Sequence, residues 1–239
     1  MANKMNIIFT DDLHFSYLPD KTIYIMSHPN PTSKHILSNG IYEKQLIDWA
    51  RDNYKNSAKI FVDIGAHMGT YSINLAPHFS HTHSFEAQKN TFYCLAGGIA
   101  LNGLSDKITA HHFALTNPDD SGKTLNLKII SLDGGGSSIR NLANNVDPIA
   151  TEEVETRTLD QFKLKRIGLI KIDVEGAEID VLKGAVKTLE ENGYPPILFE
   201  AWPDPWFEEE RKKLMDYVKS LKYTIRKVYK NNMYLATMD

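Results

Sequence analysis

The stretch IFVDIGAHMGTYS, residues 60–72, is the most informative segment for the fold class of this 239-residue chain. It opens with a short apolar run that ends at Asp63, and it continues into a loop that contains Gly65 and Gly69. A short apolar run bounded by glycine is typical of a buried strand, and the residues after Gly69 have the pattern of a helix. The stretch therefore predicts a strand, a glycine loop and a helix, which together form the repeating unit of parallel α/β sheets.

The same alternation of strand and helix continues through most of the chain after this stretch. Further strands are predicted at 82–87, 108–115, 167–174 and 196–202. Helices are predicted at 69–79, 90–102, 177–192 and 205–221. This order indicates an α/β protein with a mostly parallel sheet that is covered by helices on both faces.

Two features add to the simple alternation. Extra strands are predicted at 124–130 and 152–159, within an insertion of about 116–160 that precedes the fourth core strand. At the end of the chain, two strand-like runs flank Asn231 and Asn232, and asparagine tolerates the positive φ of a hairpin turn. The hairpin would close the sheet with an antiparallel strand and bring it to seven strands.

The N-terminal part has a weaker pattern. We expect residues 1–40 to be an extension of the core at 41–239, within a single domain, and residues 1–37 to be irregular apart from a strand at 21–28. Two prolines then indicate a loop. A helix is predicted at 38–54, with Ser38 or Asn39 as its cap.

The composition is that of a soluble globular protein, with 42% apolar and 24% charged residues. A net charge of −3 gives no strong general attraction to nucleic acid, so no nucleic-acid partner is expected. Cys94 is the single cysteine, which fits a reducing compartment. The sequence shows neither a secretory leader nor an apolar run of the roughly 18 residues that span a bilayer. We therefore expect a cytoplasmic protein without membrane contact.

The glycine loop lies where an open α/β sheet binds its ligand, outside the carboxyl end of the first strand. Gly65 and Gly69 would let a ligand approach the backbone, and the next helix would direct its amide dipoles at it. Dinucleotide sites favour G-x-G-x-x-G without an acid in the turn, whereas Asp63 suits a cationic amino group such as that of S-adenosylmethionine. Glu86 ends the next strand, about 20 residues later, where an acid can bind ribose hydroxyls in either cofactor class. The alternative is that both acids only cap neighbouring helices.

A second group of acids follows later strands. Asp173 and Glu175 come after the predicted fourth core strand, and Glu200 ends the fifth. Because the carboxyl ends of parallel strands meet at one edge of the sheet, we expect all three at the same cleft. They are our candidate general bases, although acids in a first helical turn can also be caps, which is the interpretation that suits Glu178. A divalent ion held by these carboxylates is a weaker alternative, and no metal site is predicted.

Five segments, in order, resemble the FkbM-type family of class I S-adenosylmethionine-dependent methyltransferases. The segments are FVDIGAHMGTYS, FEAQ, ALNGL, TRTLDQF and IKIDVEGAEIDVLKGA, and the resemblance runs from about Glu43 to Trp202. A Rossmann-like sheet of alternating strands closed by a hairpin is also the layout of class I methyltransferases. Characterised family members mostly methylate hydroxyl groups of sugars or secondary metabolites, so the resemblance implies the same chemistry here.

The resemblance also assigns single positions. The cofactor-binding residues that it implies are Glu43, Asp63, Gly65, Ala66, His67, Gly69, Glu86, Ala87 and Asn102. The segment GGSSI (135–139) matches a loop that closes over the site. His67 departs from the family pattern, which has asparagine, and this leaves the backbone role of the loop intact but not a side-chain contact. Residues 1–40 and 203–239 match less well.

We therefore expect an O-methyltransferase that uses S-adenosylmethionine and acts on a small-molecule or glycan acceptor, with Asp173, Glu175 and Glu200 as catalytic candidates. Two alternatives stay open. One is an NAD(P)-dependent oxidoreductase, which Asp63 and the terminal hairpin disfavour. The other is a catalytically silent module that binds the cofactor or a partner.

Overall fold

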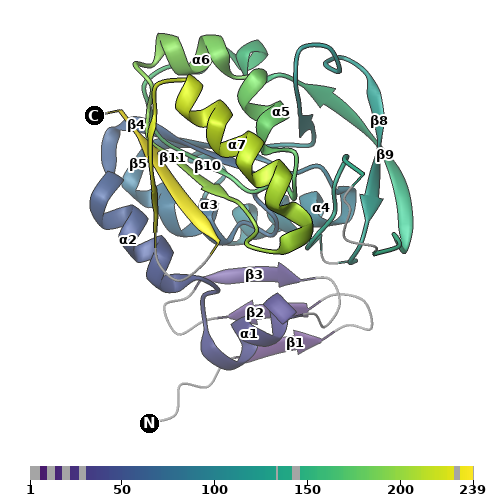
Figure 1. The fold of residues 1–239 in the computed structure, drawn as a ribbon. Helices are drawn as coiled ribbons and strands as arrows, with labels where there is room; N and C mark the ends of the chain where they lie inside the picture. Colours follow the sequence, from purple (N-terminus) through teal and green to yellow (C-terminus); the bar gives the residue numbers. More distant parts are fainter. Residues whose placement is uncertain are drawn as a thin grey trace.

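A seven-stranded sheet forms the centre of the protein (Figure 1). The structure is a computed structural model that describes residues 6–9, 14–17, 22–26, 31–132, 134–141, 146–228 and 232–238. The strand order is β12-β13-β11-β10-β4-β5-β6. The bounds are β4 Asn56–Ile64, β5 Phe79–Phe85, β6 Ile108–His111, β10 Ile167–Ile172, β11 Ile197–Glu200, β12 Thr224–Lys227 and β13 Met233–Thr237. The strands from β11 to β6 are parallel, whereas β13 pairs antiparallel with both β11 and β12. The predicted sheet and its closing hairpin are confirmed; Asn231 of the predicted turn lies outside the described residues.

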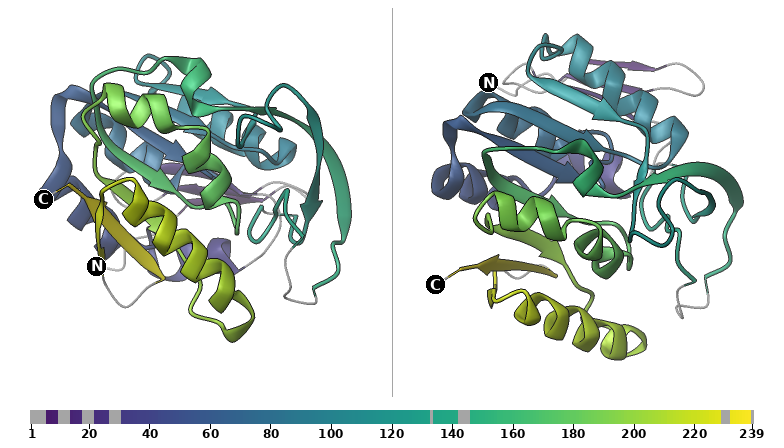
Figure 2. Two further views of the ribbon diagram at one scale, coloured as in Figure 1. Left: turned by 45° about the horizontal axis from the view of Figure 1, so that its top comes forward. Right: turned by 90° about the horizontal axis from the view of Figure 1, so that it is seen from above.

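Helices cover both faces of this sheet (Figure 2). One face packs on α2 (Lys44–Tyr54), α3 (Thr70–Leu75) and α4 (Lys89–Leu101). The other packs on α5 (Glu178–Lys183), α6 (Val186–Glu191) and α7 (Glu208–Ser220). Short 3-10 turns lie at Ala76–His78, Leu159–Phe162 and Pro205–Phe207. Because both faces are covered, every residue of β10 is buried, which explains why the central strands read as continuous apolar runs. Within the described residues, no helix is long and apolar enough to cross a membrane.

The insertion forms a separate small sheet at one side of the core, in the order β7-β9-β8 (Figure 1). Its strands are β7 Ala114–Leu115, β8 Thr124–Ile129 and β9 Ala150–Arg157. This confirms the extra strands predicted before the fourth core strand. The single strand predicted at 108–115 is wrong, because the chain leaves the core sheet after His111 and its last two residues pair with β9 instead.

The N-terminal segment is more regular than predicted. It forms an antiparallel sheet of β1 Asn6–Phe9, β2 His14–Tyr17 and β3 Ile23–Met26, followed by α1 Pro31–Asn39. Pro31, the second of the two prolines that indicated a loop, instead begins α1, because proline has no N–H to lose at the first helical position. The other proline, Pro29, lies outside the described residues. The helix predicted from residue 38 begins at Lys44, since Gly40 (φ 86°) and Glu43 (φ 53°) break the backbone between α1 and α2. Of the predicted strand 21–28, residues 21, 27 and 28 lie outside the described residues.

The long helix predicted at 177–192 is also divided, into α5 and α6. The break is at Gly184, where a Cβ atom would lie 2.0 Å from the carbonyl oxygen of Thr116. The insertion therefore packs directly against this glycine, a contact between segments far apart in the sequence.

Candidate active site

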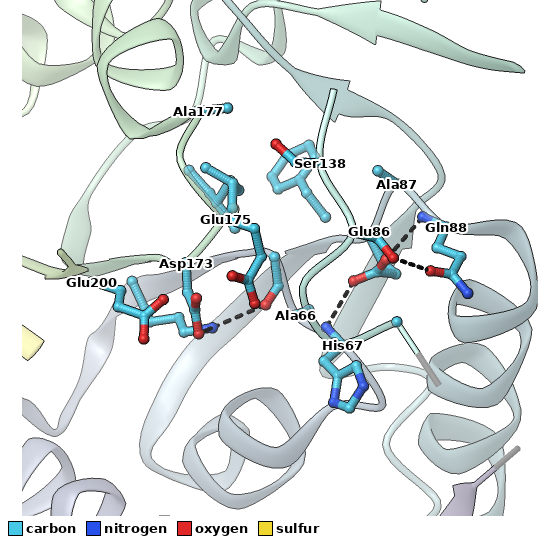
Figure 3. Close-up of a pocket in the computed structure, with 18 of the residues that line it drawn as sticks. Ala66, His67, Glu86, Ala87, Gln88, Ser138, Asp173, Glu175, Ala177 and Glu200 are labelled. Atoms are coloured by element: carbon cyan, nitrogen blue, oxygen red, sulfur yellow. Dashed lines mark hydrogen bonds and ion pairs between the residues drawn. The ribbon is translucent and has the colours of Figure 1, made fainter. Parts of the chain in front are cut away.

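A cavity opens at the carboxyl ends of β4, β5, β10 and β11, where the switch-point rule for α/β sheets places a ligand (Figure 3). A segment that we call the strap, residues 134–139, contributes to its wall. Figure 3 shows Asp173, Glu175 and Glu200 at one end of the cavity and Glu86 at the other. Glu86, from the first predicted group of acids, and all three members of the second group therefore line one cavity.

The glycine loop between β4 and α3 owes its glycines to packing. Gly65 has φ 75°, and a Cβ atom there would lie 1.7 Å from the carbonyl oxygen of Asp173. Gly69 has φ 95°, and its Cβ would lie 2.8 Å from the Cδ1 atom of Leu95. Gly65 and Ala66 line the cavity, whereas Gly69 does not. Both glycines are required by packing, Gly65 against the loop after β10 and Gly69 against α4. The expectation that Gly69 makes room for a ligand is corrected because Gly69 lies outside the cavity lining, whereas the contact of Gly65 with a ligand stays a prediction.

Glu86 is held by the backbone at the mouth of this loop. Its Oε2 atom accepts the N–H of His67 at 2.8 Å, and its Oε1 atom accepts the N–H of Gln88 at 2.9 Å. Burial raises the pKa of Glu86 to about 7, although the two N–H groups act in the opposite direction. A carboxylate can accept about four hydrogen bonds, so lone pairs remain for hydroxyl groups in the cavity. Ala87 lines the cavity beside it.

His67 has the same backbone role that asparagine would have at this position. Its φ of 53° is in the left-handed region, where asparagine and histidine are both enriched. Its side chain packs against the strap, because a Cβ atom on Gly134 would lie 3.0 Å from the His67 ring. The departure from the family pattern therefore preserves the N–H that Glu86 accepts.

Asp63 does not face the cavity, which corrects the expected contact with a ligand amino group. Its side chain is fully buried and accepts a hydrogen bond from the Ser72 hydroxyl at 2.5 Å. Its Oδ1 atom has no hydrogen-bond partner among the described residues and lies 3.8 Å from the ammonium of Lys171. Burial raises the pKa of Asp63, and Lys171 opposes this rise. The positive charge next to Asp63 is therefore the ammonium of Lys171 and not that of a ligand.

Asp173, Glu175 and Glu200, which we call the acid cluster, each place a carboxylate oxygen within 4.8 Å of the others. Burial, followed by the charge of Asp173, raises the pKa of both Glu175 and Glu200. Glu175 also accepts the N–H of Gly136 in the strap at 3.1 Å. Hard divalent cations prefer such oxygens, so these are the residues in the described part of the chain that could hold one. The absence of a metal site stays a prediction.

Lys171 is a buried residue of the cavity that the sequence interpretation missed. Its side chain is 4% exposed and lines the cavity, where it lies 3.1 Å from Asp173 Oδ2. Lysine is almost never fully buried unless it is paired. A lysine inside the apolar run IGLIKIDV was therefore a signal of a buried ion pair, although the sequence did not show its partner.

Two further predicted cofactor residues have different positions. Glu43 lines the cavity, and its Oε2 atom accepts a hydrogen bond from the Tyr71 hydroxyl at 2.8 Å. Asn102 lies outside the cavity lining. Its Oδ1 accepts the Ile23 N–H at 3.0 Å, and its Nδ2 donates to the Ile23 carbonyl at 2.7 Å. Asn102 therefore joins β3 to the end of α4 through these two hydrogen bonds.

The strap lies over the cavity and corresponds to the segment GGSSI, for which the resemblance implied a closing loop. Ser137 and Ser138 line the cavity. The Ser137 hydroxyl donates to Gln88 Oε1 at 2.9 Å, and the amide of Gln88 donates to the Leu132 carbonyl at 3.2 Å. The strap is thus joined to both ends of the cavity, through Gln88 beside Glu86 and through Glu175 in the acid cluster.

Comparison with known proteins agrees with this architecture. Residues 63–225, more than half of the chain, match the family described as the Methyltransferase FkbM domain. The crystal structure of methyltransferase FkbM from Methylobacillus flagellatus KT is 18% identical with a TM-score of 0.52, over 75% of this chain and 43% of that one. A candidate rRNA methylase from Clostridium thermocellum is 12% identical with a TM-score of 0.51, over 80% of this chain and 91% of that one. This chain thus spans less than half of the first relative, and these likenesses establish the fold alone, a Rossmann-like class I methyltransferase fold. No curated protein matches the sequence.

Proposed function

Because the chain belongs to the FkbM methyltransferase family, we propose that it transfers the methyl group of S-adenosylmethionine to a hydroxyl group of a sugar, a glycan or a glycosylated metabolite. Methyltransferase chemistry follows from the family. The hydroxyl acceptor and its chemical class are inferences from the resemblance to the family.

The residues of the cavity fit this cofactor. Glu86 offers carboxylate oxygens to ribose hydroxyls at the end of β5. Ala87, Phe113 and Leu115 provide an apolar wall suited to a purine. The acidic lining complements a ligand with a positive charge, whereas it would repel the pyrophosphate of a dinucleotide. S-adenosylmethionine is therefore the cofactor that this donor set suits.

When bound, S-adenosylmethionine supplies an electrophilic methyl group attached to a positively charged sulfur. The protein must orient the acceptor, exclude water and take the hydroxyl proton. A sugar hydroxyl is a weak nucleophile, and general-base assistance is worth roughly 10²- to 10⁴-fold. The acid cluster supplies three carboxylates for this role, and the strap covers the same cavity.

The observation that carries the proposal is the meeting of two acid sets in one cavity. Glu86 lies at one end, in the position that suits a nucleoside, and the acid cluster lies at the other (Figure 3). A site that only binds a nucleoside needs the first set. A site that also deprotonates an acceptor needs both.

The decisive experiment is incubation of the full chain with methyl-labelled S-adenosylmethionine and a panel of sugars and glycosides, followed by detection of methylated product by mass. We expect label in a hydroxyl-derived methoxy group. Label on nitrogen or carbon would contradict the O-methyl assignment, and heat from NAD binding without heat from S-adenosylmethionine would contradict the cofactor.

Matched variants separate an enzyme from a silent binding module. Asp173→Asn and Glu175→Gln proteins should bind S-adenosylmethionine within a few-fold of wild type, because neither residue lies at the Glu86 end of the cavity. At least one should lose turnover by roughly 10²-fold or more. Unchanged turnover in both would remove these two residues as bases.

A further inference from the structure

Segments from both ends of the chain complete the wall of the cavity beside the acid cluster. Tyr42 and Glu43, in the turn between α1 and α2, line the cavity, and so does Met233 of β13, which pairs with Glu200. These three lining residues lie outside the segment 63–225 that matches the FkbM family, whereas the acid cluster lies within it. Chemistry common to the family belongs to the matched part, so the unmatched part of the wall is where this chain can select its own acceptor.

The backbone of this turn is fixed on both sides of Tyr42. Gly40 has φ 86° and Glu43 has φ 53°, so both are in the left-handed region. Left-handed backbone is unfavourable for a glutamate and persists only where the surrounding contacts hold it. Here the Glu43 carbonyl accepts the N–H of Leu46 at 2.9 Å, and its side chain accepts the hydrogen bond from the Tyr71 hydroxyl. Tyr42 is therefore held at the cavity by its neighbours along the chain.

Tyr42 offers an open aromatic ring at this wall. It is 39% exposed, and among the exposed large apolar residues in the described part of the chain it is the one that lines the cavity. The ring of His35 packs edge-on against it, with the centroids 5.3 Å apart and the planes at 87°. Burial, followed by the charges of Glu43 and Asp173, raises the pKa of Tyr42, so its hydroxyl keeps its proton at neutral pH. Tyr42 thus combines a flat apolar face with a polar tip that can donate a hydrogen bond.

The charged groups of the cavity suit an acceptor without negative charge. Lys171 is the single lysine or arginine among the described residues that line it. Its ammonium already donates to the Gly65 carbonyl at 2.9 Å and lies 3.1 Å from Asp173 Oδ2. Phosphate and carboxylate groups are recognised by cationic side chains and N–H groups, whereas Glu43 and the acid cluster present carboxyl oxygens. Such oxygens can accept hydrogen bonds from the hydroxyl groups of an uncharged sugar.

We propose that Tyr42 is a specificity-determining residue for the acceptor, and that its ring is the platform for one face of a sugar that carries neither phosphate nor carboxylate. This inference rests on the proposed function. The C–H groups of a sugar ring are slightly positive and pack on the negative face of an aromatic ring. A sugar held there has its hydroxyl groups near the acid cluster, because the charges of all three cluster members act on the Tyr42 hydroxyl.

The first test measures sugar binding and needs no turnover. The full chain is saturated with S-adenosylhomocysteine, which has no methyl group to transfer. The methyl glycosides of glucose, galactose and mannose are added at about 10 mM for saturation-transfer-difference NMR, and methyl glucuronide and glucose 6-phosphate are the anionic counterparts. We expect signals from the ring C–H protons of at least one uncharged glycoside and none from the anionic sugars. No signal from any uncharged glycoside, or stronger signals from an anionic sugar, would overturn the proposal.

Variants of Tyr42 show whether the aromatic ring is responsible. Tyr42→Leu keeps an apolar side chain without a flat ring, and Tyr42→Phe keeps the ring. Tyr93→Leu is the matched control, because Tyr93 is 57% exposed on α4 and lies outside the cavity lining. The sugar signals should fall at least about fivefold in Tyr42→Leu and stay in Tyr42→Phe and the control. If Tyr42→Leu does not fold, as judged by circular dichroism, Tyr42→Gln replaces it. Unchanged signals in the variant without the ring would contradict the platform.

Kinetics with a methylated acceptor separate this inference from the proposed function. Tyr42→Leu should raise KM for the acceptor by about tenfold or more and leave KM for S-adenosylmethionine within about threefold, because Tyr42 lies beside the acid cluster. Methylation with an unchanged KM for the acceptor in Tyr42→Leu would refute the role of Tyr42 and leave the proposed function intact. Sugar binding that depends on Tyr42, without methylation of any acceptor, would refute the proposed function and support the sugar site.

Discussion

Glu178 gives the sharpest test of the electrostatics of this fold, because its burial has a calculable pH dependence. The side chain is 3% exposed, and its Oε1 atom accepts the N–H groups of Val174 at 3.2 Å and Gly176 at 3.1 Å. Burial raises the pKa of Glu178 from 4.5 to about 7, against the effect of these N–H groups. Between those two values the folded protein binds more protons than the unfolded chain, so stability falls as pH rises and then levels off above about pH 7.

The substitution Glu178→Gln keeps a carbonyl oxygen for both N–H groups and removes the buried charge. One pKa unit corresponds to about 1.4 kcal/mol, so between pH 5 and pH 8 the wild type should lose roughly 2 to 3 kcal/mol that the variant keeps. Any constant packing cost of the amide cancels when the variant and the wild type are compared at both pH values.

The assay is urea denaturation followed by circular dichroism at pH 5 and pH 8. Glu190→Gln, on the exposed face of α6, is the matched control and should show the same small difference from the wild type at both pH values. If the stability difference between Glu178→Gln and the wild type were equal at pH 5 and pH 8, the reasoning from a buried charge would be refuted.

Three further predictions concern the loop, the cofactor end and the N-terminal sheet. Glu86→Ala should weaken S-adenosylmethionine binding by about 1–3 kcal/mol in a calorimetric titration, and wild-type affinity would exclude its ribose role. Gly65→Ala should destabilise the fold by more than about 3 kcal/mol in urea, because its Cβ meets a backbone oxygen at 1.7 Å; Gly103→Ala, at φ 66° in open space, should cost only about 1–2 kcal/mol. Similar losses of stability in the two variants would show that the positive φ, and not the contact with the carbonyl oxygen, accounts for the effect. Asn102→Ala should speed hydrogen exchange at the Ile23 amide and leave cofactor affinity unchanged, and a tenfold fall in affinity would restore Asn102 to the cofactor site.

The central sheet could be predicted from the sequence alone. The runs in β4 and β10 are mostly apolar, with Asp63 and Lys171 as exceptions, because both faces of a parallel sheet are covered. This pattern is visible without knowing which helix covers them. The closing hairpin could also be predicted, because its two strands and its turn are neighbours in the sequence. In the N-terminal sheet, the strand that contains Ile23 was predicted, but β1 and β2 were missed, because short strands depend on their pairing with neighbours, here β1 with β2 and β2 with β3.

Most acidic residues of the candidate site were predicted, but the hydrogen bonds and ion pairs between its residues were not. The rule that parallel strands end at one edge brought Glu86 and the acid cluster to one cavity. No rule of spacing shows that Asp63 turns away from that cavity toward Lys171, or that Gly65 makes room for a carbonyl oxygen. Periodicity is a property of neighbours along the chain, and it therefore specifies strands and their faces. The pairing of buried charges depends on which side chains, distant in the sequence, lie together away from water, and this becomes visible only in the folded protein.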